Sequence, residues 1–428
     1  MQDLYAHAQR VFGSADKIMP GLWWLAMVFL LAACLWQPTQ AQTYRVIHDF
    51  TGGADGAYPR ATLTLDRAGN FYGTAGGGGA GGNGTVFKLT HSGSGWVLVP
   101  VYRFQGGYDG SVPWSPVTMS PDGTLFGTTL SGGYFQGEYC AQGGCGLVYN
   151  LKPGPRAATS ALAPWTQSVL RAFTGPPYDG DGPVYGTLIL DQAGNLYGTT
   201  QFGGPQIGGV VFELTPSPGG WSENILYTFP YGFKGGEPYA GVVMDSAGNL
   251  YGTSSRGGLS DVGTVYELSP TSNGWTETVL HSFGSGNDGR VPYGGLIFDQ
   301  AGNLYDATAL GGTVSGGVVY ELSPSSNGWT YKVLYNLPPA EGPFEDLSID
   351  ASGSLYGTSN SSGTGEAGMV FKLSQSNGNW ILADLHDFTF STAYFPYGGV
   401  TIDADGNLYG TAPYGGAYGY GVIWEITP

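Results

Sequence analysis

Short runs of Val, Ile, Leu, Tyr and Phe alternate along this chain with turns rich in Gly, Pro, Asn and Ser. The runs recur in a fixed order of four, which one copy shows at residues 295–299, 303–308, 317–322 and 329–337. Apolar runs of this length between turn residues are typical of β-strands. No segment after residue 44 has the apolar spacing of an amphipathic helix. The pattern therefore predicts an all-β protein made of four-stranded units.

One phrase, Asp-x-x-Gly-Asn-Leu-Tyr-Gly-Thr or a close variant, recurs in every copy. It covers the turn that follows the first run and then the second run. Its seven copies begin at Asp66, Ser120, Asp191, Asp245, Asp299, Asp350 and Asp403. A regular period of 51 to 54 residues, interrupted once by an interval of 71, indicates a repeat architecture. Residues present in every copy are expected to serve the fold, so function is expected where the copies differ.

Seven four-stranded sheets in a row predict a seven-bladed β-propeller, because radial closure covers the sheet faces and leaves only short edges. An open solenoid is the alternative. Residues 44–50 match the fourth strand of a repeat, whereas the last copy ends with its third strand at residues 421–426. We therefore expect the N-terminal strand to close the last blade, while a solenoid would need capping repeats.

The first 41 residues differ from the repeats. Arg10 and Lys17 precede an apolar stretch at residues 21–36, and small residues end at Ala41, which predicts a signal peptide over residues 1–41. A lipoprotein signal with Cys34 as the lipidated residue, or an uncleaved anchor, are the alternatives. Each hypothesis places residues 42–428, one propeller domain without a transmembrane span, outside the cytoplasm of a bacterium.

Charge and cysteine content restrict the partners and the compartment. Only 11% of the residues are charged and the net charge is −17, so the surface repels nucleic acids and anionic membranes. The charge is compatible with neutral glycans, cations or basic partners. Cys140 and Cys145 lie in one loop, and in an oxidising compartment we expect them to form a disulfide.

The repeated phrase, the Gly-x-Val-aromatic-Glu-Leu strand and the Val-Leu-His-Ser-Phe-x-Gly-x-x-Asp-Gly segment resemble the GloVer tandem repeats of exported bacterial proteins. The resemblance covers residues 44–428. It implies a propeller-like, extracytoplasmic repeat protein with varied anchoring, and it supplies no catalytic residues.

Two sets of loops are expected to share one face of the propeller: the Gly-rich loops after the second strand, and the loops from the fourth strand to the next blade. Loops on a rigid scaffold are where binding sites concentrate, so this is the candidate functional face. The second set carries Asp-Gly four residues before Pro, at Asp55, Asp109, Asp179 and Asp288. We expect these residues to form turns, and contact with a ligand or cation is the alternative.

An aromatic residue follows this Pro in most copies: Trp114, Tyr239, Tyr293, Phe344 and Tyr397. Arg60 takes the place in the first copy, and Tyr185 is displaced by one position. These residues are expected to ring the mouth of the central channel. One hypothesis is that they stack against sugar rings. The other is that they pack between neighbouring blades and do nothing else.

Three carboxylates interrupt the repeat in the fifth and sixth copies. Asp306 replaces the Gly of Leu-Tyr-Gly-Thr, and Glu345 and Asp346 replace small residues at the start of an innermost strand. Carboxylates close together raise the pKa of one member, which favours an acid/base pair, or collect Ca²⁺ with loop carbonyls. Repeat drift at a solvated rim is the third interpretation.

These observations predict an exported, monomeric and non-catalytic binding propeller, without an evident cofactor, that recognises glycans or other cell-surface components. A hydrolase or lyase acting on polysaccharide through Asp306, Glu345 and Asp346 is one alternative. A purely structural surface protein is the other. The fold does not choose among them, because propellers support many activities.

Overall fold

The structure is a computed structural model that describes residues 42–93, 95–133, 140, 143–154, 165–230, 232–284, 286–340 and 342–428. The predicted signal segment with Cys34, and most of the two insertions of the second repeat at 134–144 and 152–164, lie outside the described residues. In the part that is described, no helix has the length and apolar character needed to span a membrane. Residues Tyr44–Thr427 form one compact unit.

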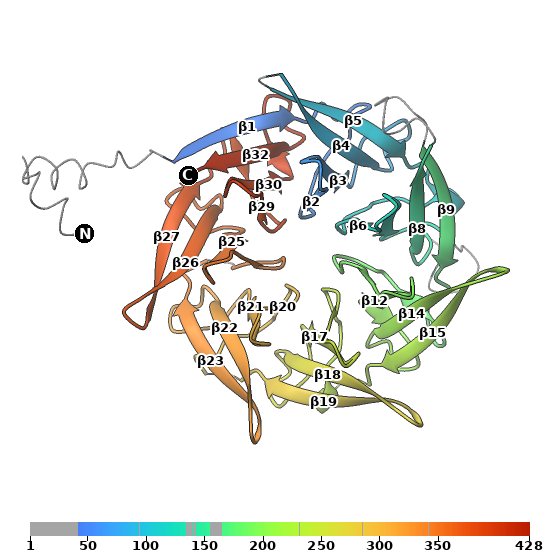
Figure 1. The fold of residues 1–428 in the computed structure, drawn as a ribbon, viewed down its shortest axis with the longest axis vertical. Coiled ribbons are helices and arrows are strands. Elements are labelled where there is room, and N and C mark those ends of the chain that lie inside the picture. The colour runs from blue at the N-terminus through green and yellow to red at the C-terminus, as the bar shows by residue number, and fades with distance from the viewer. Residues whose placement is uncertain are drawn as a thin grey trace, which may run out of the picture. The chain divides into compact units, whose positions relative to one another are not determined.

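The described residues form seven four-stranded antiparallel sheets around a common axis, which confirms the seven-bladed β-propeller (Figure 1). Blade one contains β2 (Thr64–Leu65), β3 (Phe71–Ala75), β4 (Thr85–Ser92) and β5 (Gly95–Arg103). Blade two contains β6 (Thr118–Met119), β7 (Leu125–Thr129), β8 (Leu147–Pro153) and β9 (Trp165–Ala172). Blade three contains β11 (Ile189–Leu190), β12 (Leu196–Thr200), β14 (Val210–Ser217) and β15 (Gly220–Thr228). Blade four contains β16 (Val243–Met244), β17 (Leu250–Ser254), β18 (Thr264–Thr271) and β19 (Gly274–Ser282).

Blades five and six contain β20 (Ile297–Phe298), β21 (Leu304–Ala307), β22 (Val318–Ser325), β23 (Gly328–Asn336) and β24 (Ser348–Ile349), β25 (Leu355–Ser359), β26 (Met369–Ser376), β27 (Asn379–Asp387). Blade seven contains β29 (Thr401–Ile402), β30 (Leu408–Ala412), β32 (Val422–Thr427) and the N-terminal β1 (Thr43–Asp49). Short ladders join β10 (Gly180–Asp181) to β13 (Phe202–Gly203) and β28 (Ala393–Tyr394) to β31 (Tyr414–Gly415). Two 3₁₀ turns occur at Gly107–Asp109 and Gly232–Lys234.

Ring closure occurs as the sequence predicts. β1 is the outermost strand of blade seven and lies beside β32, so the blue and red ends of the chain meet in Figure 1. The Phe50 amide donates to the Gly421 carbonyl at 2.9 Å. Arg45 pairs with the nearly buried Glu425 at 2.5 Å. The first and last strands of the domain therefore form one sheet.

The repeated phrase builds the turn between the two inner strands of each blade. In blade five, Asp299 Oδ1 accepts the amides of Ala301 and Asn303, both at 2.8 Å. Its Oδ2 accepts from the Asn303 side chain at 2.8 Å and from the Tyr305 hydroxyl at 3.2 Å. Gly302 has a φ of 85°, which a tight turn requires and which Gly adopts without strain. Asp, Gly, Asn and Tyr therefore recur because one turn uses all four.

The hydrophobic core is divided into layers between adjacent blades. One layer combines Tyr251 and Val265 of blade four with Leu296, Leu304 and Tyr320 of blade five. Both faces of each sheet are therefore covered, as the nearly continuous apolar runs predict. A Cβ on Gly421, where the third strand of blade seven begins, would lie 2.7 Å from the Pro59 ring of blade one. The Gly of one blade and the Pro of the next thus form a close contact that a side chain at the Gly position would prevent.

Candidate functional site

The two loop sets lie on one face, as expected, because among the described residues they bond to each other in six of the seven blades. Single antiparallel bridges or short ladders join them at the pairs Ala57–Gly77, Ser111–Ser131, Asp181–Phe202, Gly236–Arg256, Arg290–Leu310 and Tyr394–Tyr414. We call this surface the loop-rich face. Each bridge fixes where the chain turns from the rim toward the innermost strand, so the residues that follow have a defined position.

The residue before the Pro in this segment adopts a left-handed backbone in most blades. Val291, a β-branched residue, has a φ of 57°, a conformation that costs about 1–2 kcal/mol for a residue other than Gly. Its N–H donates to the Val262 carbonyl of blade four at 2.7 Å, and its carbonyl accepts the Ala309 amide of its own blade at 3.1 Å. Hydrogen bonds to two blades hold the strained residue. A similar φ occurs at Tyr58, Val112, Glu237 and Phe395.

The residues after these prolines come together in a closed circle around the propeller axis. We call this circle the collar; its members are Arg60, Trp114, Tyr185, Tyr239, Tyr293, Phe344 and Tyr397. From Trp114 to Tyr397 the successive ring centroids are 5.7, 5.7, 4.6, 4.9 and 5.3 Å apart. The guanidinium of Arg60 lies 4.7 Å from the Tyr397 ring and 4.5 Å from the Trp114 ring, which completes the circle.

The stacking inside the collar limits what its rings can offer a ligand. The planes of Trp114 and Tyr185 differ by 6°, those of Tyr185 and Tyr239 by 14°, and those of Tyr293 and Phe344 by 12°. Rings stacked in this way cover part of each other's faces. All members are half-buried. The collar therefore presents ring edges and hydroxyls more than free ring faces.

Arg60 is the charged member of the collar. Its Nη1 donates to the Tyr185 hydroxyl at 3.2 Å and its Nη2 donates to the Tyr414 hydroxyl at 3.0 Å. The Nε atom is buried and has no hydrogen-bond partner among the described residues. Arg60 is held by cation–π contacts and two hydroxyls. It links the collar to the loop of blade seven that carries Tyr414.

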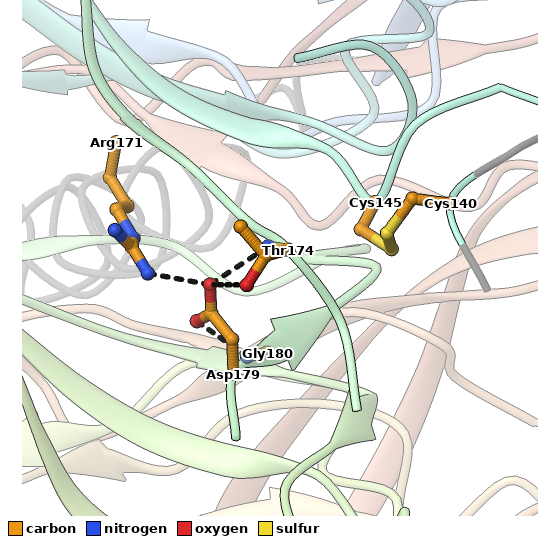
Figure 2. The surroundings of a disulfide bond; sticks show 6 residues. All are labelled: Cys140, Cys145, Arg171, Thr174, Asp179 and Gly180. Carbon is orange, nitrogen blue, oxygen red and sulfur yellow. Dashed lines mark hydrogen bonds and ion pairs between the residues drawn. A yellow bond between two sulfur atoms is a disulfide. The ribbon is translucent and has the colours of Figure 1, made fainter. Parts of the chain in front are cut away.

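The Asp-Gly residues close their own loops. The carboxylates of Asp55, Asp109 and Asp288 accept the amides of Thr51, Gln105 and Gly284, each four residues earlier, at 3.0, 2.6 and 3.1 Å. Asp179 accepts from the Thr174 amide at 2.8 Å and from Arg171 at 2.5 Å (Figure 2). Each carboxylate is therefore engaged by its own loop or by the strand before it, which is the geometry of a turn former.

Asp306 lies in the core of blade five, where the other blades have Gly. It is fully buried, and the Tyr320 hydroxyl donates to its Oδ2 at 2.9 Å. Its Oδ1 has no hydrogen-bond partner among the described residues. Burial raises the pKa of Asp306 well above its usual value, and the charge of Asp346 adds to the rise. Asp306 therefore lies in the packed interior of blade five and not at a solvated rim.

The side chains of Glu345 and Asp346, neighbours at the start of blade six, reach different blades. The Thr62 hydroxyl of blade one lies 3.5 Å from Glu345 Oε2, whereas Asp346 Oδ1 accepts the Gly295 amide of blade five at 2.6 Å. Glu345 is only 4% exposed, and its Oε1 has no partner among the described residues. Burial raises the pKa of Glu345 well above its usual value, and Asp346 adds to this. Burial also raises the pKa of Asp346.

The three carboxylates share one seam between blades, but their oxygens do not converge. Within the described ranges, no group of three or more His, Cys, Asp or Glu side chains is arranged to hold a metal ion. The Ca²⁺ interpretation of Asp306, Glu345 and Asp346 therefore has no geometric support in this part of the chain.

Cys140 and Cys145 form the expected disulfide, and both residues are buried (Figure 2). They pack with Phe126 and Phe173 in the layer between blades two and three. The Gly182 amide of blade three donates to the Cys145 carbonyl at 3.1 Å. The disulfide therefore anchors the loop of blade two against the next blade on the loop-rich face.

The loop-rich face also exposes aromatic rings that the sequence interpretation did not single out. They are Tyr108 (71% exposed), Tyr178 (88%), Phe233 (72%), Phe390 (57%) and Tyr418 (61%). The one signal in the sequence is an aromatic residue beside the loop Asp, as at Tyr108 and Tyr178, or within the corresponding segment. Single exposed apolar residues are common on protein surfaces, so these rings are of interest as a set on one face rather than one by one.

Around blade seven the exposed rings belong to a larger group. We call Tyr58, Phe390, Tyr394, Phe395, Tyr414 and Tyr420 the blade-seven cluster. Tyr394 stacks on Tyr414 with centroids 5.4 Å apart, and Phe390 lies 5.2 Å from Tyr394. Tyr58 connects Tyr414, at 5.8 Å, with Tyr420, at 5.9 Å. The structure thus assembles loops from both ends of the domain into one aromatic surface.

The sequence matches the Gloeobacter/Verrucomicrobia repeat over residues 34–187, 134–343 and 276–428, which together span all seven blades. The chain belongs to this family. No curated protein matches the sequence. The membership confirms the resemblance drawn from the repeated phrase.

Several solved structures are similar to this family member at low sequence identity. The extracellular domain of a B. thetaiotaomicron protein described as a putative one component system matches with a TM-score of 0.54 and 12% identity, over 90% of this chain. The chain spans only 40% of that protein. A Thermus thermophilus protein described as an oxidoreductase (glucose dehydrogenase) matches 80% of this chain and is itself 99% covered, with 16% identity and a TM-score of 0.46. An ulvan lyase of a new polysaccharide lyase family matches 88% and is 94% covered, with 10% identity and a TM-score of 0.48.

Against the repeats of this family member, two places stand out. The seam between blades five and six carries the buried carboxyls of Asp306 and Glu345, where most other blades have Gly or Ala, as at Gly398 and Ala61. The junction of blades seven and one carries the blade-seven cluster. These two junctions together are the candidate site.

Proposed function

We propose that this protein is a non-catalytic binding propeller that recognises carbohydrate through its loop-rich face. The observation that supports the proposal best is the set of five largely exposed aromatic rings at loop tips of this face. A pyranose ring has an apolar face that packs on an aromatic ring and hydroxyls that bond to the surrounding polar groups. A rigid scaffold with loops of this kind suits such a ligand.

Charge supports a neutral ligand. The net charge of −17 disfavours nucleic acids and other polyanions. The collar adds several hydroxyls and the guanidinium of Arg60, which can bond sugar hydroxyls. The buried disulfide and the signal-like segment at residues 1–41 support a role outside the cytoplasm.

Glycan binding by the purified protein tests the proposal. A variant with Tyr108, Tyr178, Phe233, Phe390 and Tyr418 replaced by Ala should lose at least about ten-fold in affinity for any glycan that the natural protein binds. The matched control replaces Val97, Val169 and Ile381 by Ala, because these exposed apolar residues lie on outer strands. We expect the control to bind normally. Absence of glycan binding, or an equal loss in the control, contradicts the proposal.

An enzyme acting on polysaccharide is the second candidate, and Glu345 is the observation that favours it. This carboxyl is nearly buried near the collar, its pKa is raised by burial, and its Oε1 has no partner among the described residues. A carboxyl whose pKa is raised by burial in such a place suits a general acid. Depolymerisation of a bound polysaccharide that disappears in Glu345→Gln, with binding retained, would establish the enzyme and overturn the non-catalytic proposal.

A further inference from the structure

Blade seven departs from the other blades at the bridge between its two loops. In the other bridged blades the paired residues are Ala57–Gly77, Ser111–Ser131, Asp181–Phe202, Gly236–Arg256 and Arg290–Leu310. Blade seven has an aromatic pair, Tyr394 opposite Tyr414, with the rings stacked at an interplanar angle of 20°. Since shared residues serve the fold, a position where one blade carries two aromatic rings is a candidate for function.

The aromatic pair is the centre of a continuous surface. Phe390 lies 5.2 Å from Tyr394 on the outer side and is 57% exposed. On the other side Tyr58 and Tyr420 are 38% and 39% exposed. Rings that contact one another and also face solvent form a platform longer than a single sugar unit. The blade-seven cluster therefore suits several consecutive sugars rather than one.

The platform continues into the collar. Arg60 Nη2 donates to the Tyr414 hydroxyl at 3.0 Å, and the same guanidinium lies over the collar ring of Tyr397 at 4.7 Å. The path from Phe390 to the collar therefore consists of aromatic residues up to Arg60, the charged member of the collar. A ligand lying along this path would meet rings at the rim and a donor-rich group at the axis.

The chemistry of the cluster favours a neutral saccharide. Its members are Tyr and Phe, without an aliphatic side chain, whereas a protein-docking surface would need a broader area of at least about 800 Å² per partner. The neighbouring acidic groups are Asp49, whose Oδ1 accepts the Ala417 amide at 2.7 Å, and Asp55 in its loop. These carboxylates beside the cluster disfavour an anionic polymer.

We propose that the blade-seven cluster is the platform on which the loop-rich face binds a neutral polysaccharide chain, with several sugar units laid from Phe390 toward the collar. The proposal rests on the proposed function and specifies its ligand class and location. It assigns the main contacts to the junction of blades seven and one, and a lesser role to the exposed rings of blades two to four.

Isothermal titration tests the platform with defined probes: cellohexaose, xylohexaose, laminarihexaose and mannohexaose, and the disaccharide of each series. At least one hexasaccharide should bind, and its disaccharide should bind at least about ten-fold more weakly because it covers fewer rings. Phe390→Ala and Tyr420→Ala should each weaken hexasaccharide binding about ten-fold, which is typical of losing one stacking ring. Phe390→Tyr keeps a ring and should restore binding.

Ile381→Ala on the outer strand β27 is the matched control, because Ile381 is also an exposed apolar side chain, at 51%. It should leave hexasaccharide affinity unchanged. Binding that is lost in Phe233→Ala but unaffected in Phe390→Ala and Tyr420→Ala overturns the platform and leaves the proposed function intact. A natural protein that binds no hexasaccharide overturns both. If it also forms dimers in ultracentrifugation that Phe390→Ala disperses, the cluster is a protein interface instead.

Discussion

Replacing Asp306 by Asn should change how the stability of the protein depends on pH. Asp306 is fully buried, and burial raises the pKa of its carboxyl well above its usual value. In the unfolded chain the same carboxyl ionises near pH ~4. Between that pH and the raised folded-state pKa, the unfolded chain loses a proton that the folded protein keeps. The carboxyl therefore favours folding at low pH, and this contribution is lost as the pH rises.

The size of the effect follows from proton linkage. One proton difference between the two states changes the free energy of unfolding by about 1.4 kcal/mol per pH unit. The amide introduced by Asp306→Asn does not titrate, so relative to the natural protein the variant should gain about 1.4 kcal/mol per pH unit from about pH 5 up to the folded-state pKa of Asp306, and no more beyond it. The same buried amide adds a constant offset of about 1–3 kcal/mol if it lacks a partner. The slope, rather than the value at one pH, is therefore the quantity to compare.

Urea denaturation at pH 5, 6, 7 and 8 measures this slope, and Asp299→Asn in the same blade is the matched control. Partial burial acts to raise the pKa of Asp299, but hydrogen bonds from Asn303 and the Ala301 amide lower it below its usual value. Asp299 therefore stabilises the fold above about pH 4, and this contribution is lost as the pH falls through its folded-state pKa. Asp299→Asn should be destabilising and show no gain above pH 5. A flat difference for Asp306→Asn would mean that Asp306 ionises normally in the folded protein, which would refute the argument.

Three further predictions concern the fold. Deleting residues 42–49 removes β1 from blade seven, so amide hydrogen exchange in β32 should become faster than in β22, the equivalent strand of blade five; equal rates would contradict closure by β1. Ser315 has a φ of 63° at an exposed position where Gly82 and Gly419 stand in other blades, so Ser315→Gly should raise the free energy of unfolding by about 1 kcal/mol and Gly419→Ser should lower it by a similar amount, measured by chemical denaturation. Peptide mapping without reductant should find Cys140 joined to Cys145, and replacing both by Ser should lower stability by about 2 kcal/mol, the loop-closure effect of a short loop; unchanged stability would argue against an anchoring role for the disulfide.

Most of the fold could be predicted because each repeat carries the same sequence of strand-forming runs and turn residues. The four strands of blade five, expected at residues 295–299, 303–308, 317–322 and 329–337, occur as β20 to β23 with shorter inner strands. The innermost strands are reduced to two residues, since the preceding segment is held by bridges to the loops of its own blade rather than by a neighbouring strand. Ring closure was predictable because residues 44–50 repeat the fourth-strand pattern in a chain that lacks the rest of that repeat.

The candidate site was less predictable, because contacts between distant residues create it. The aromatic residues after the prolines were found by their position, but the sequence does not show that they stack on one another or that Arg60 fits between Trp114 and Tyr397. The three carboxylates were identified as departures from the repeat, yet their burial and diverging directions depend on neighbouring blades. The blade-seven cluster combines Tyr58 with residues near the other end of the domain, such as Tyr414, which no local pattern reveals.

The contacts between blades give a physical context for the two junctions at which the repeats differ most. At most junctions the fit between blades depends on Gly: a Cβ on Gly84 would lie 2.5 Å from Pro113, and one on Gly421 would lie 2.7 Å from Pro59. A threonine hydroxyl of one blade also donates to a carbonyl of the next, as Thr253 does to Gly294 at 2.9 Å. Blade five lacks this donor because Ala307 replaces the Thr, and the carboxyls of Asp306, Glu345 and Asp346 fill the same seam. A change at such a position is tolerated only when its neighbours change with it, since the blades pack closely. The carboxyls at one seam and the aromatic residues at another are such grouped changes, and single-residue variants at these two junctions test whether the residues take part in binding.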